Sequence, residues 1–483
     1  MGFSSPVSRR LLFIIVTMPS LTSEDPPSPA LSTRAIVLAA GKGTRMRSSR
    51  PKVLHPLRGL PLIEHALRSA VAATQSRPVV VVGHDAAAVQ AVISDRADCV
   101  LQSEQMGTGH AVMVTETALR DDPARQYLIT AADMPLVRVD TLRMLAERRA
   151  AAGAAITILT VVVDDPRGFG RIVRDGSGNV VAIVEDVACT PQQRRINELN
   201  GAIYCIEAAW LWAALKRIHP NPHKGEYFLT DLVGIAVADG RQVQAFITTD
   251  NDECIGINTR VDLADADAAL RRRINRAHML AGVSIVDPAS TYIDPDVTIS
   301  ADVTILPNTH LLGRTRIGAD SVIGPNSLLR DAIVGSGCEI RQSVVEDAQV
   351  DDGADVGPFS HLRRGARVGA GAHVGNFGEI KNSSLGARSK MGHFSYLGDA
   401  TVGTGVNIGA GAITCNYDGV SKHPTTIGDG AFIGSDTLLI APVEVGANAS
   451  TGAGAVVTKD VPPDTVAVGL PARVIRKKGK GNT

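Results

Sequence analysis

Two different patterns of hydrophobic and polar residues divide this chain. From residue 34 to about residue 258, apolar runs rich in β-branched residues alternate with amphipathic segments. The amphipathic segments at 62–73, 109–120 and 139–150 have the spacing of helices. Buried strands are predicted at 35–40, 78–84, 126–136 and 154–163. Because these strands lack polar alternation, they predict a parallel sheet that is covered by helices on both faces.

The second pattern begins after residue 281, where an aliphatic residue or methionine recurs every six positions. The series consists of Ile293, Ile299, Ile305, Leu311, Ile317, Ile323 and Leu329, then Val350, Val356, Leu362, Val368, Val374 and Ile380, then Leu385, Met391 and Leu397, and finally Ile427, Ile433, Leu439 and Val445. Hexapeptide periodicity predicts a parallel β-helix with three hexads per coil and the aliphatic residues inside. One insertion, TCNYDGVSKHPTT at 414–426, interrupts the repeat, and such loops commonly carry function.

The segments between and beside these two regions complete the predicted domain organisation. Residues 259–281 have helical spacing and predict a connecting helix, whose Arg271–Arg273 run we interpret as a solvated face. The predicted domains are 34–258 and 282–475, with a disordered extension at 1–33 and a basic tail at 476–483. The extension contains RRLLFIIV, which is too short for a membrane span, and Met18 is an alternative start.

Composition excludes several function classes. The 483 residues include 49 Lys plus Arg and 49 Asp plus Glu, so no net charge favours nucleic acid or an anionic membrane. The six cysteines have no C-x-x-C spacing, which indicates reduced thiols in place of a disulfide framework or a zinc site. We therefore expect a cytoplasmic protein that acts on small molecules.

The stretch AIVLAAGKGTRM at 35–46 is the first candidate for chemistry. Gly41 and Gly43 follow a predicted strand and would let backbone N–H groups approach phosphate oxygens. Arg45 and Lys52 would supply positive charge for those phosphates. The pattern is not a Walker loop, and a glycine pair after a strand also occurs in ordinary surface turns.

Further motifs along the chain strengthen the phosphate interpretation. LAAGKGTRM and PKVLH are followed, in order, by LQSEQMGTGHA, GFGRI, IVED, GEYFLTD and GIN, and then by GHFSYLGDA and NIGAGAITCNYDG in the repeat region. This combination resembles the bacterial family that fuses an N-acetylglucosamine-1-phosphate uridylyltransferase to a glucosamine-1-phosphate acetyltransferase. The resemblance covers residues 34 to about 475. It implies an α/β fold, in which a Rossmann-like nucleotidyltransferase domain with a mostly parallel sheet is followed by a left-handed parallel β-helix of hexapeptide repeats.

The resemblance also implies two reactions and their co-substrates. Glucosamine 1-phosphate would first be acetylated by acetyl-CoA, and UMP would then be transferred from UTP to the N-acetylated sugar phosphate, releasing pyrophosphate. The product, UDP-N-acetylglucosamine, would feed peptidoglycan and lipopolysaccharide synthesis. Mg²⁺ would be the cofactor of the second reaction, and the protein would be a homotrimer without nucleic-acid or membrane partners.

Residue roles in the first domain follow from the same resemblance. Asp133 and Asn258 would ligate Mg²⁺, which fits a hard cation held by few protein oxygens plus phosphates and water. Arg45 and Lys52 would neutralise charge during phosphoryl-type transfer. The residues implied to contact UTP or UDP-N-acetylglucosamine are Leu38, Ala39, Gly41, Lys52, Gln102, Gly107, Thr108, Gly170, Glu185, Asn200 and Asn258. Within this set, Gln102, Gly107 and Thr108 would hold the uracil, and Gly170, Glu185 and Asn200 would hold the N-acetylated sugar.

In the repeat region, the resemblance makes His393 the general base that removes a proton from the attacking sugar amine. A histidine titrates near neutrality, which suits that task. The implied glucosamine-1-phosphate site consists of Arg363, Lys381, Tyr396, Asn407 and Lys422, and the implied acetyl-CoA site of Ala410, Asn416, Tyr417, Ser435, Ala453 and Leu470. The acetyl-transfer sites would lie between subunits.

Three positions depart from the family pattern. Ala131 and Ala132 precede the implied metal ligand where relatives often carry a larger residue and glycine. Gly201 and Ala202 follow Asn200 where a hydroxyl residue and glycine are usual. Leu470 stands where some relatives have an arginine. We expect the two alanines before Asp133 to make the pocket roomier.

Two alternative functions remain open on the sequence. One is a nucleotidyltransferase of single function with a structural β-helix, against which His393 and the 414–426 insertion argue. The other is a regulatory scaffold without catalysis, against which Gly41, Arg45 and Lys52 argue together with the implied metal ligands.

Overall fold

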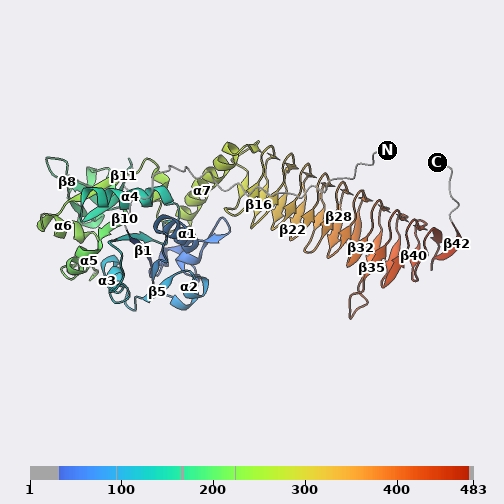
Figure 1. Ribbon diagram of the computed structural model, residues 1–483, viewed down its shortest axis with the longest axis horizontal. Helices are drawn as coiled ribbons and strands as arrows, with labels where there is room; N and C mark the ends of the chain where they lie inside the picture. Colours follow the sequence, from blue (N-terminus) through green and yellow to red (C-terminus); the bar gives the residue numbers. More distant parts are fainter. Residues whose placement is uncertain (1–31, 94, 165–167, 223–224, 478–483) are drawn as a thin grey trace, which may run out of the picture.

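The computed structural model describes residues 32–477, apart from residues 94, 165–167 and 223–224. The expected extension up to residue 31 and the basic tail from residue 478 lie outside the described residues. Figure 1 shows a globular N-terminal part and a long shaft, with helix α7 (Arg260–Leu280) between them. The division into domains at this helix stays our proposal.

The globular part contains a nine-stranded sheet in the order β11-β7-β10-β6-β1-β4-β5, in which β8 also pairs with β10, and β9 pairs with β8. The strands are β1 (Thr33–Ala39), β4 (Val79–Val82), β5 (Asp98–Leu101), β6 (Gln126–Ala131), β7 (Ile156–Val162), β8 (Arg171–Arg174), β9 (Val180–Val184), β10 (Glu198–Glu207) and β11 (Val243–Ile247). β1 runs parallel to both β4 and β6, whereas β10 is antiparallel to β6 and β7. The prediction of a mostly parallel sheet is confirmed.

Helices cover both faces of this sheet. They are α1 (Leu62–Thr74), α2 (Ala86–Ile93), α3 (Thr108–Met113), α4 (Val139–Ala152), α5 (Ala208–Leu215) and α6 (Asp231–Ala238). Along β1, Ala35 and Val37 pack with residues of α1, and Ile36 packs in a second cluster with residues of α3, α5 and α6. Helix α3 is shorter than the predicted helix at 109–120. The Thr115 hydroxyl donates a hydrogen bond to the Val112 carbonyl at 2.7 Å, a local contact that competes with helix continuation.

The shaft is a parallel β-helix with three sheets along its length. Twelve strands from β12 (Ser284–Ile285) to β42 (Arg473–Lys477) form one sheet, ten from β13 (Tyr292–Ile293) to β40 (Val456–Val457) the second, and nine from β14 (Thr298–Ile299) to β38 (Val443–Val445) the third. The aliphatic positions of the hexapeptide series form one continuous core, with Ile299 at its partly buried edge. The predicted β-helix is confirmed.

The gap in the predicted series between Leu329 and Val350 is not a gap in the core. Val334, Ile340 and Val345 fill the inward positions there. Ile305 pairs with Ile323, eighteen residues on, whereas Val334 pairs with Val350, sixteen residues on. Some coils therefore contain fewer than eighteen residues because their corners are shorter. A strict six-residue count misses the inward positions of these coils, although their strands still pair with the neighbouring coils.

Helix α7 packs against both parts of the molecule, so its arginines are not simply solvated. Arg271 lies 4.9 Å over the ring of Tyr292 in the first coil. Arg273 donates to the Leu136 carbonyl at 2.5 Å and pairs with Asp250 at 2.9 Å. The interpretation of the Arg271–Arg273 run as a solvated face is therefore wrong for these two residues.

The described residues show no sign of a membrane span or of a metal cluster. None of the described helices combines the length and the apolar character that crossing a membrane requires. Within the described ranges, no group of three or more His, Cys, Asp or Glu side chains is arranged so that it could hold a metal ion. All six cysteines are free, as expected.

Candidate active sites

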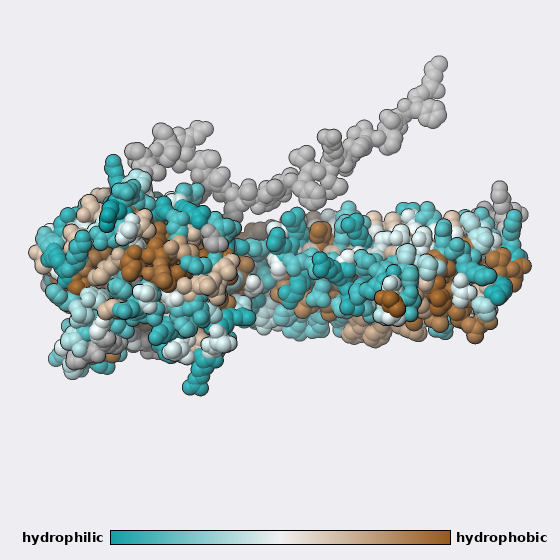
Figure 2. Space-filling model, turned by 90° about the horizontal axis from the view of Figure 1, so that it is seen from below, coloured by the Kyte–Doolittle hydropathy of each residue, from teal (hydrophilic) through white to brown (hydrophobic). Residues whose placement is uncertain are grey.

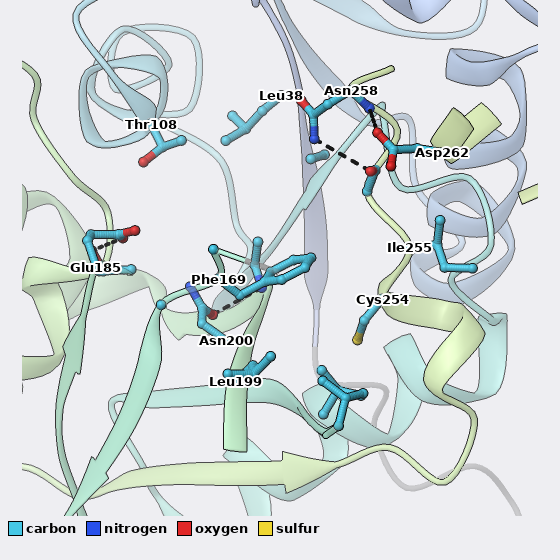
Figure 3. Close-up of a pocket in the computed structure, with 18 of the residues that line it drawn as sticks. Leu38, Thr108, Phe169, Glu185, Leu199, Asn200, Cys254, Ile255, Asn258 and Asp262 are labelled. Carbon is cyan, nitrogen blue, oxygen red and sulfur yellow. Dashed lines mark hydrogen bonds between the residues drawn. The ribbon is translucent and has the colours of Figure 1, made fainter. Parts of the chain in front are cut away.

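A cavity of about 710 Å³ lies at the carboxyl ends of the parallel strands. Figure 3 shows side chains from β1, β10 and the segment before α7 pointing into it. Seven residues implied by the family resemblance line this cavity, namely Leu38, Arg45, Thr108, Gly170, Glu185, Asn200 and Asn258. Strands and loops far apart in the sequence therefore form one site.

Four polar residues implied in catalysis and metal binding meet at one edge of the cavity. The Lys52 ammonium pairs with the Asp133 carboxylate and lies 3.3 Å from the Asn258 amide oxygen. Arg45 donates to the same amide oxygen at 2.8 Å. Two cations and two oxygen ligands therefore share one small space, which is an arrangement suited to a substrate rich in negative charge.

The glycine-rich loop packs closely against Lys52 at Gly43. Gly43 has a φ of 61°, in the left-handed region, and a Cβ atom there would come within 2.5 Å of the Lys52 Cβ. Only glycine combines that backbone angle with so close an approach. The turn after β1 is therefore shaped to hold the Lys52 side chain beside Asp133, although Gly41 itself has open space around it.

The Asn258 backbone is fixed by the start of helix α7. Thr259 caps the helix in a capping box with Asp262, and the Asp262 carboxylate also accepts the Asn258 N–H at 2.9 Å (Figure 3). Burial of Asp262 opposes its ionisation, but the hydrogen bonds from Asn258 and Thr259 outweigh that effect and lower its pKa. The cap therefore keeps a charged carboxylate beside Asn258.

The oxygen atoms of Asp133 and Asn258 fit a hard cation that retains most of its water ligands. Asp133 offers a carboxylate and Asn258 an amide oxygen, and both lie near one point, because both contact Lys52. Oxygen ligands in this small number suit Mg²⁺, which commonly takes one or two protein ligands and completes its shell with substrate phosphates and water.

The residues implied to hold the uracil lie beside the cavity. Gln102 is buried, and its amide donates to the Gly107 carbonyl at 3.2 Å. Gly107 has a φ of 98° and packs against the backbone of Tyr227, which leaves no room for a Cβ. The Thr108 hydroxyl accepts the N–H of Leu229 at 3.1 Å. Ala39, by contrast, is buried at the end of β1 in the sheet core.

The sugar side of the cavity is built on an irregular part of β10. The Asn200 amide donates to the Tyr204 hydroxyl at 2.8 Å, across a register shift in the pairing with β7. Gly201 passes so close to the Leu159 carbonyl that a Cβ would lie 2.7 Å from it, and Ala202 has a φ of 55°. The hydroxyl residue that is usual in the family would therefore not fit at position 201 on this backbone. Gly201 and Ala202 instead form the irregular part of β10 where its register with β7 shifts.

The two alanines before Asp133 have different environments. Ala131 lines the cavity, so a small residue there leaves space beside the Leu38 side chain. Ala132 is fully buried in the hydrophobic cluster of β1 and α1 and donates its N–H to the Leu38 carbonyl. Only Ala131 can affect the volume of the cavity directly.

Sequence reasoning missed several residues that line the cavity. Phe169, Tyr204, Cys254 and Asp262 all face it. Burial raises the pKa of the Cys254 thiol to about 12, so this cysteine lines the cavity as a protonated, unreactive thiol. The spacing Thr259-x-x-Asp262 at the start of an amphipathic helix is a capping-box signal that could have identified Asp262 from the sequence.

A second group of polar residues lies on the shaft, where Arg363, Lys381 and Lys422 come together. Lys422, first, and then Arg363 lower the pKa of Lys381, because neighbouring positive charges oppose its protonation. Lys422 belongs to the insertion, whose Asn416 amide donates to Asp399 at 2.5 Å. Cations from two coils and the insertion are therefore close together, and Arg363 also pairs with the Glu379 carboxylate at 2.8 Å.

His393 lies in a row along one edge of the shaft. It comes two residues after Met391, and Ala410, Ser435 and Ala453 occupy the same position after the strand residues that stack on Met391 in the following coils. Backbone hydrogen bonds of 2.7–2.8 Å join successive corners of this row. Leu470, three residues after Ala467, continues the row at its exposed end.

The remaining implied residues divide between these two groups. Asn407 lies in β33 (Asn407–Ile408), on the sheet that leads to the His393 edge. Asn416 and Tyr417 lie in the insertion with Lys422, and the Tyr417 hydroxyl donates to the Gly419 carbonyl. Strand β31 (Ser395–Gly398), which carries Tyr396, runs from the His393 edge to Gly398, which pairs with Lys381. At about 3.3 Å per residue, roughly 15 Å of strand separates the two groups.

Comparison with known proteins defines the class. Residues 35–202 match the MobA-like NTP transferase domain, and residues 296–331 and 424–459 match the bacterial transferase hexapeptide repeat. The chain is therefore an enzyme that joins a nucleotidyltransferase to a hexapeptide-repeat transferase.

Full-length relatives then define the family. The chain is 46% identical to the bifunctional protein GlmU of Exiguobacterium sibiricum over 90% of its own length and 96% of the relative's. It is 47% identical to that of Heliobacterium modesticaldum, over 90% and 94%, and 45% identical to that of Streptococcus equi subsp. zooepidemicus, over 92% and 96%. The chain belongs to the GlmU family of bifunctional enzymes. The prediction of combined uridylyl and acetyl transfer is confirmed.

Proposed function

We propose that the 710 Å³ cavity transfers UMP from UTP to N-acetylglucosamine 1-phosphate, and that the shaft acetylates glucosamine 1-phosphate with acetyl-CoA. The convergence of Arg45, Lys52, Asp133 and Asn258 supports the first assignment. The cationic group around Lys381 supports the second. Because UTP and acetyl-CoA are cytoplasmic metabolites, we assign the protein to the cytoplasm.

In uridylyl transfer, an oxygen of the sugar phosphate attacks the α-phosphorus of UTP, and the bond to the leaving pyrophosphate breaks. Mg²⁺ held by Asp133 and Asn258 would neutralise phosphate charge. Lys52 and Arg45 place positive charge at the same edge, and Asn200 and Glu185 line the sugar side. Positioning and charge neutralisation are the main requirements of such a transfer.

In acetyl transfer, the sugar amine attacks the acetyl carbonyl of acetyl-CoA, the C–S bond breaks, and CoA leaves as the thiolate. His393 takes the proton that the amine loses. The cations Arg363, Lys381 and Lys422 hold the sugar phosphate, and the row from Ala410 to Ala453 receives acetyl-CoA. The small residues of that row leave the edge open to a ligand.

The separation of the two groups on the shaft supports assembly as a homotrimer. Because roughly 15 Å of strand lies between His393 and Lys381 in one chain, we propose that each site is completed by a neighbouring copy. Phe359 and Phe377 stack at 5.4 Å on the His393 edge and are 53% and 61% exposed, which is costly for a monomer in water. Figure 2 shows further hydrophobic residues gathered toward the C-terminal end of the shaft, where Leu470 and Ile475 are exposed.

Asp133→Asn should reduce uridylyl transfer at least about 10²-fold, because the variant loses the only carboxylate assigned to Mg²⁺. Acetyl transfer by the same preparation should stay at the wild-type rate and serves as the control for folding. The measurement is pyrophosphate release over a range of Mg²⁺ concentrations. Near-normal turnover at limiting Mg²⁺ would contradict the metal assignment.

His393→Ala should lower acetyl transfer roughly 10²–10⁴-fold, the usual contribution of a positioned proton acceptor. Uridylyl transfer to supplied N-acetylglucosamine 1-phosphate should not change, because that site lies in the globular part. CoA release should be followed from pH 5.5 to 9 in both proteins. A variant within tenfold of the wild type would show that His393 only positions the substrate.

A double variant, Phe359→Asp with Phe377→Asp, should dissociate the trimer and abolish acetyl transfer while sparing uridylyl transfer. The reason is that two charges would be buried in the proposed subunit contact. Light scattering gives the mass, and Val261→Asp on α7, where Val261 is 69% exposed, is the matched control. A wild-type monomer with full acetyl transfer would rule out sites shared between subunits.

A further inference from the structure

Glu253 is a buried carboxylate for which the mechanism above has no use. It lies in the 3₁₀ turn η5 (Asn251–Cys254), five residues before Asn258, and is 2% exposed. Its Oε2 accepts the backbone N–H of Arg138 at 2.9 Å, and its Oε1 accepts the hydroxyls of Thr141 at 2.9 Å and Thr248 at 3.2 Å. Neutral donors therefore surround a group that is expensive to bury.

The position of these donors explains how the charge is tolerated. Arg138 is the N-cap residue of α4, and no side chain of its own caps that helix. The Glu253 carboxylate therefore lies at the positive end of the α4 dipole and satisfies one of the unpaired N–H groups of the first turn. A residue from a distant loop acts as the cap of this helix.

This cap ties together the two loops that carry the candidate metal ligands. Residues 133–138 connect β6 to α4 and begin with Asp133, whereas residues 250–258 end with Asn258. The Ile257 N–H also donates to the Asp133 carbonyl at 2.8 Å. A third link comes from Arg273 of α7, which bridges the Leu136 carbonyl and Asp250. Of the two carboxylates among these links, Glu253 is 2% exposed, whereas the Asp250 side chain is 30% exposed.

We infer that Glu253 is a positioning residue that sets the separation of Asp133 and Asn258, and so the affinity of the uridylyl-transfer site for its divalent cation. The inference rests on the proposed function of that site. Glu253 touches neither substrate nor metal, and it acts through the backbone of the two loops. Replacement of residues that contact metal ligands without contacting the metal typically lowers metal affinity by about 10–100-fold.

The variant Glu253→Gln keeps the shape of the side chain but loses its charge and one acceptor. We expect the dissociation constant for Mn²⁺, measured by electron paramagnetic resonance with UDP-N-acetylglucosamine present, to rise at least about tenfold. The Mg²⁺ concentration for half-maximal uridylyl transfer should rise in parallel, and acetyl transfer should not change.

Leu211→Ala is the control, because Leu211 is a fully buried residue of α5 whose hydrophobic cluster includes no residue of either loop. It should lower the melting temperature and leave the Mn²⁺ affinity unchanged. Wild-type Mn²⁺ affinity in Glu253→Gln, or an equal loss of affinity in Leu211→Ala, would overturn the inference.

Two further variants keep the test decisive if Glu253→Gln does not fold. Thr141→Val and Thr248→Val each remove one hydrogen bond to Glu253 and should weaken Mn²⁺ binding by smaller factors. Unchanged affinity in both would again contradict the inference. Asp133→Asn separates a failure of the proposed metal site from a failure of the role assigned to Glu253. Wild-type Mn²⁺ binding in Asp133→Asn would refute the metal site itself.

Discussion

Helix α7 begins directly after Asn258, and both halves of the molecule depend on that junction. The capping box of Thr259 and Asp262 fixes the first turn of the helix and the Asn258 backbone together. Farther along, Asp267 pairs with Arg58 of the globular part at 2.8 Å, and Arg271 stacks on Tyr292 of the first coil. The same helix therefore shapes one site and attaches the shaft that carries the other.

The sequence predicted those features that repeat or that follow from local chemistry. The hexapeptide period located the shaft because every inward residue must stack on its equivalent in the next coil, as Ile305 does on Ile323. The connecting helix was predicted at 259–281 and spans Arg260–Leu280. The sequence motifs placed Gly43 and Lys52 in the same predicted phosphate site. In the structure the two residues pack against each other, so that a Cβ on Gly43 would collide with Lys52.

The features that could not be predicted depend on contacts between distant segments. Nothing local to β10 indicates that it reverses direction between β6 and β7, because a buried strand has the same composition in either direction. Glu253 looks like an ordinary loop carboxylate until the fold places it at the start of α4. Arg273 likewise belongs to a charge run, and it donates to the carbonyl of Leu136, which lies 137 residues away in the chain.

The central claim is that one chain carries two independent activities in sequence. The most direct measurement incubates the full chain with glucosamine 1-phosphate, acetyl-CoA, UTP and Mg²⁺ and follows all sugar phosphates by mass spectrometry. UDP-N-acetylglucosamine should accumulate, omission of UTP should stop the reaction at N-acetylglucosamine 1-phosphate, and omission of acetyl-CoA should leave the starting sugar unchanged. Formation of the uridylylated product only from supplied N-acetylglucosamine 1-phosphate, with no acetylated sugar from acetyl-CoA, would contradict the account.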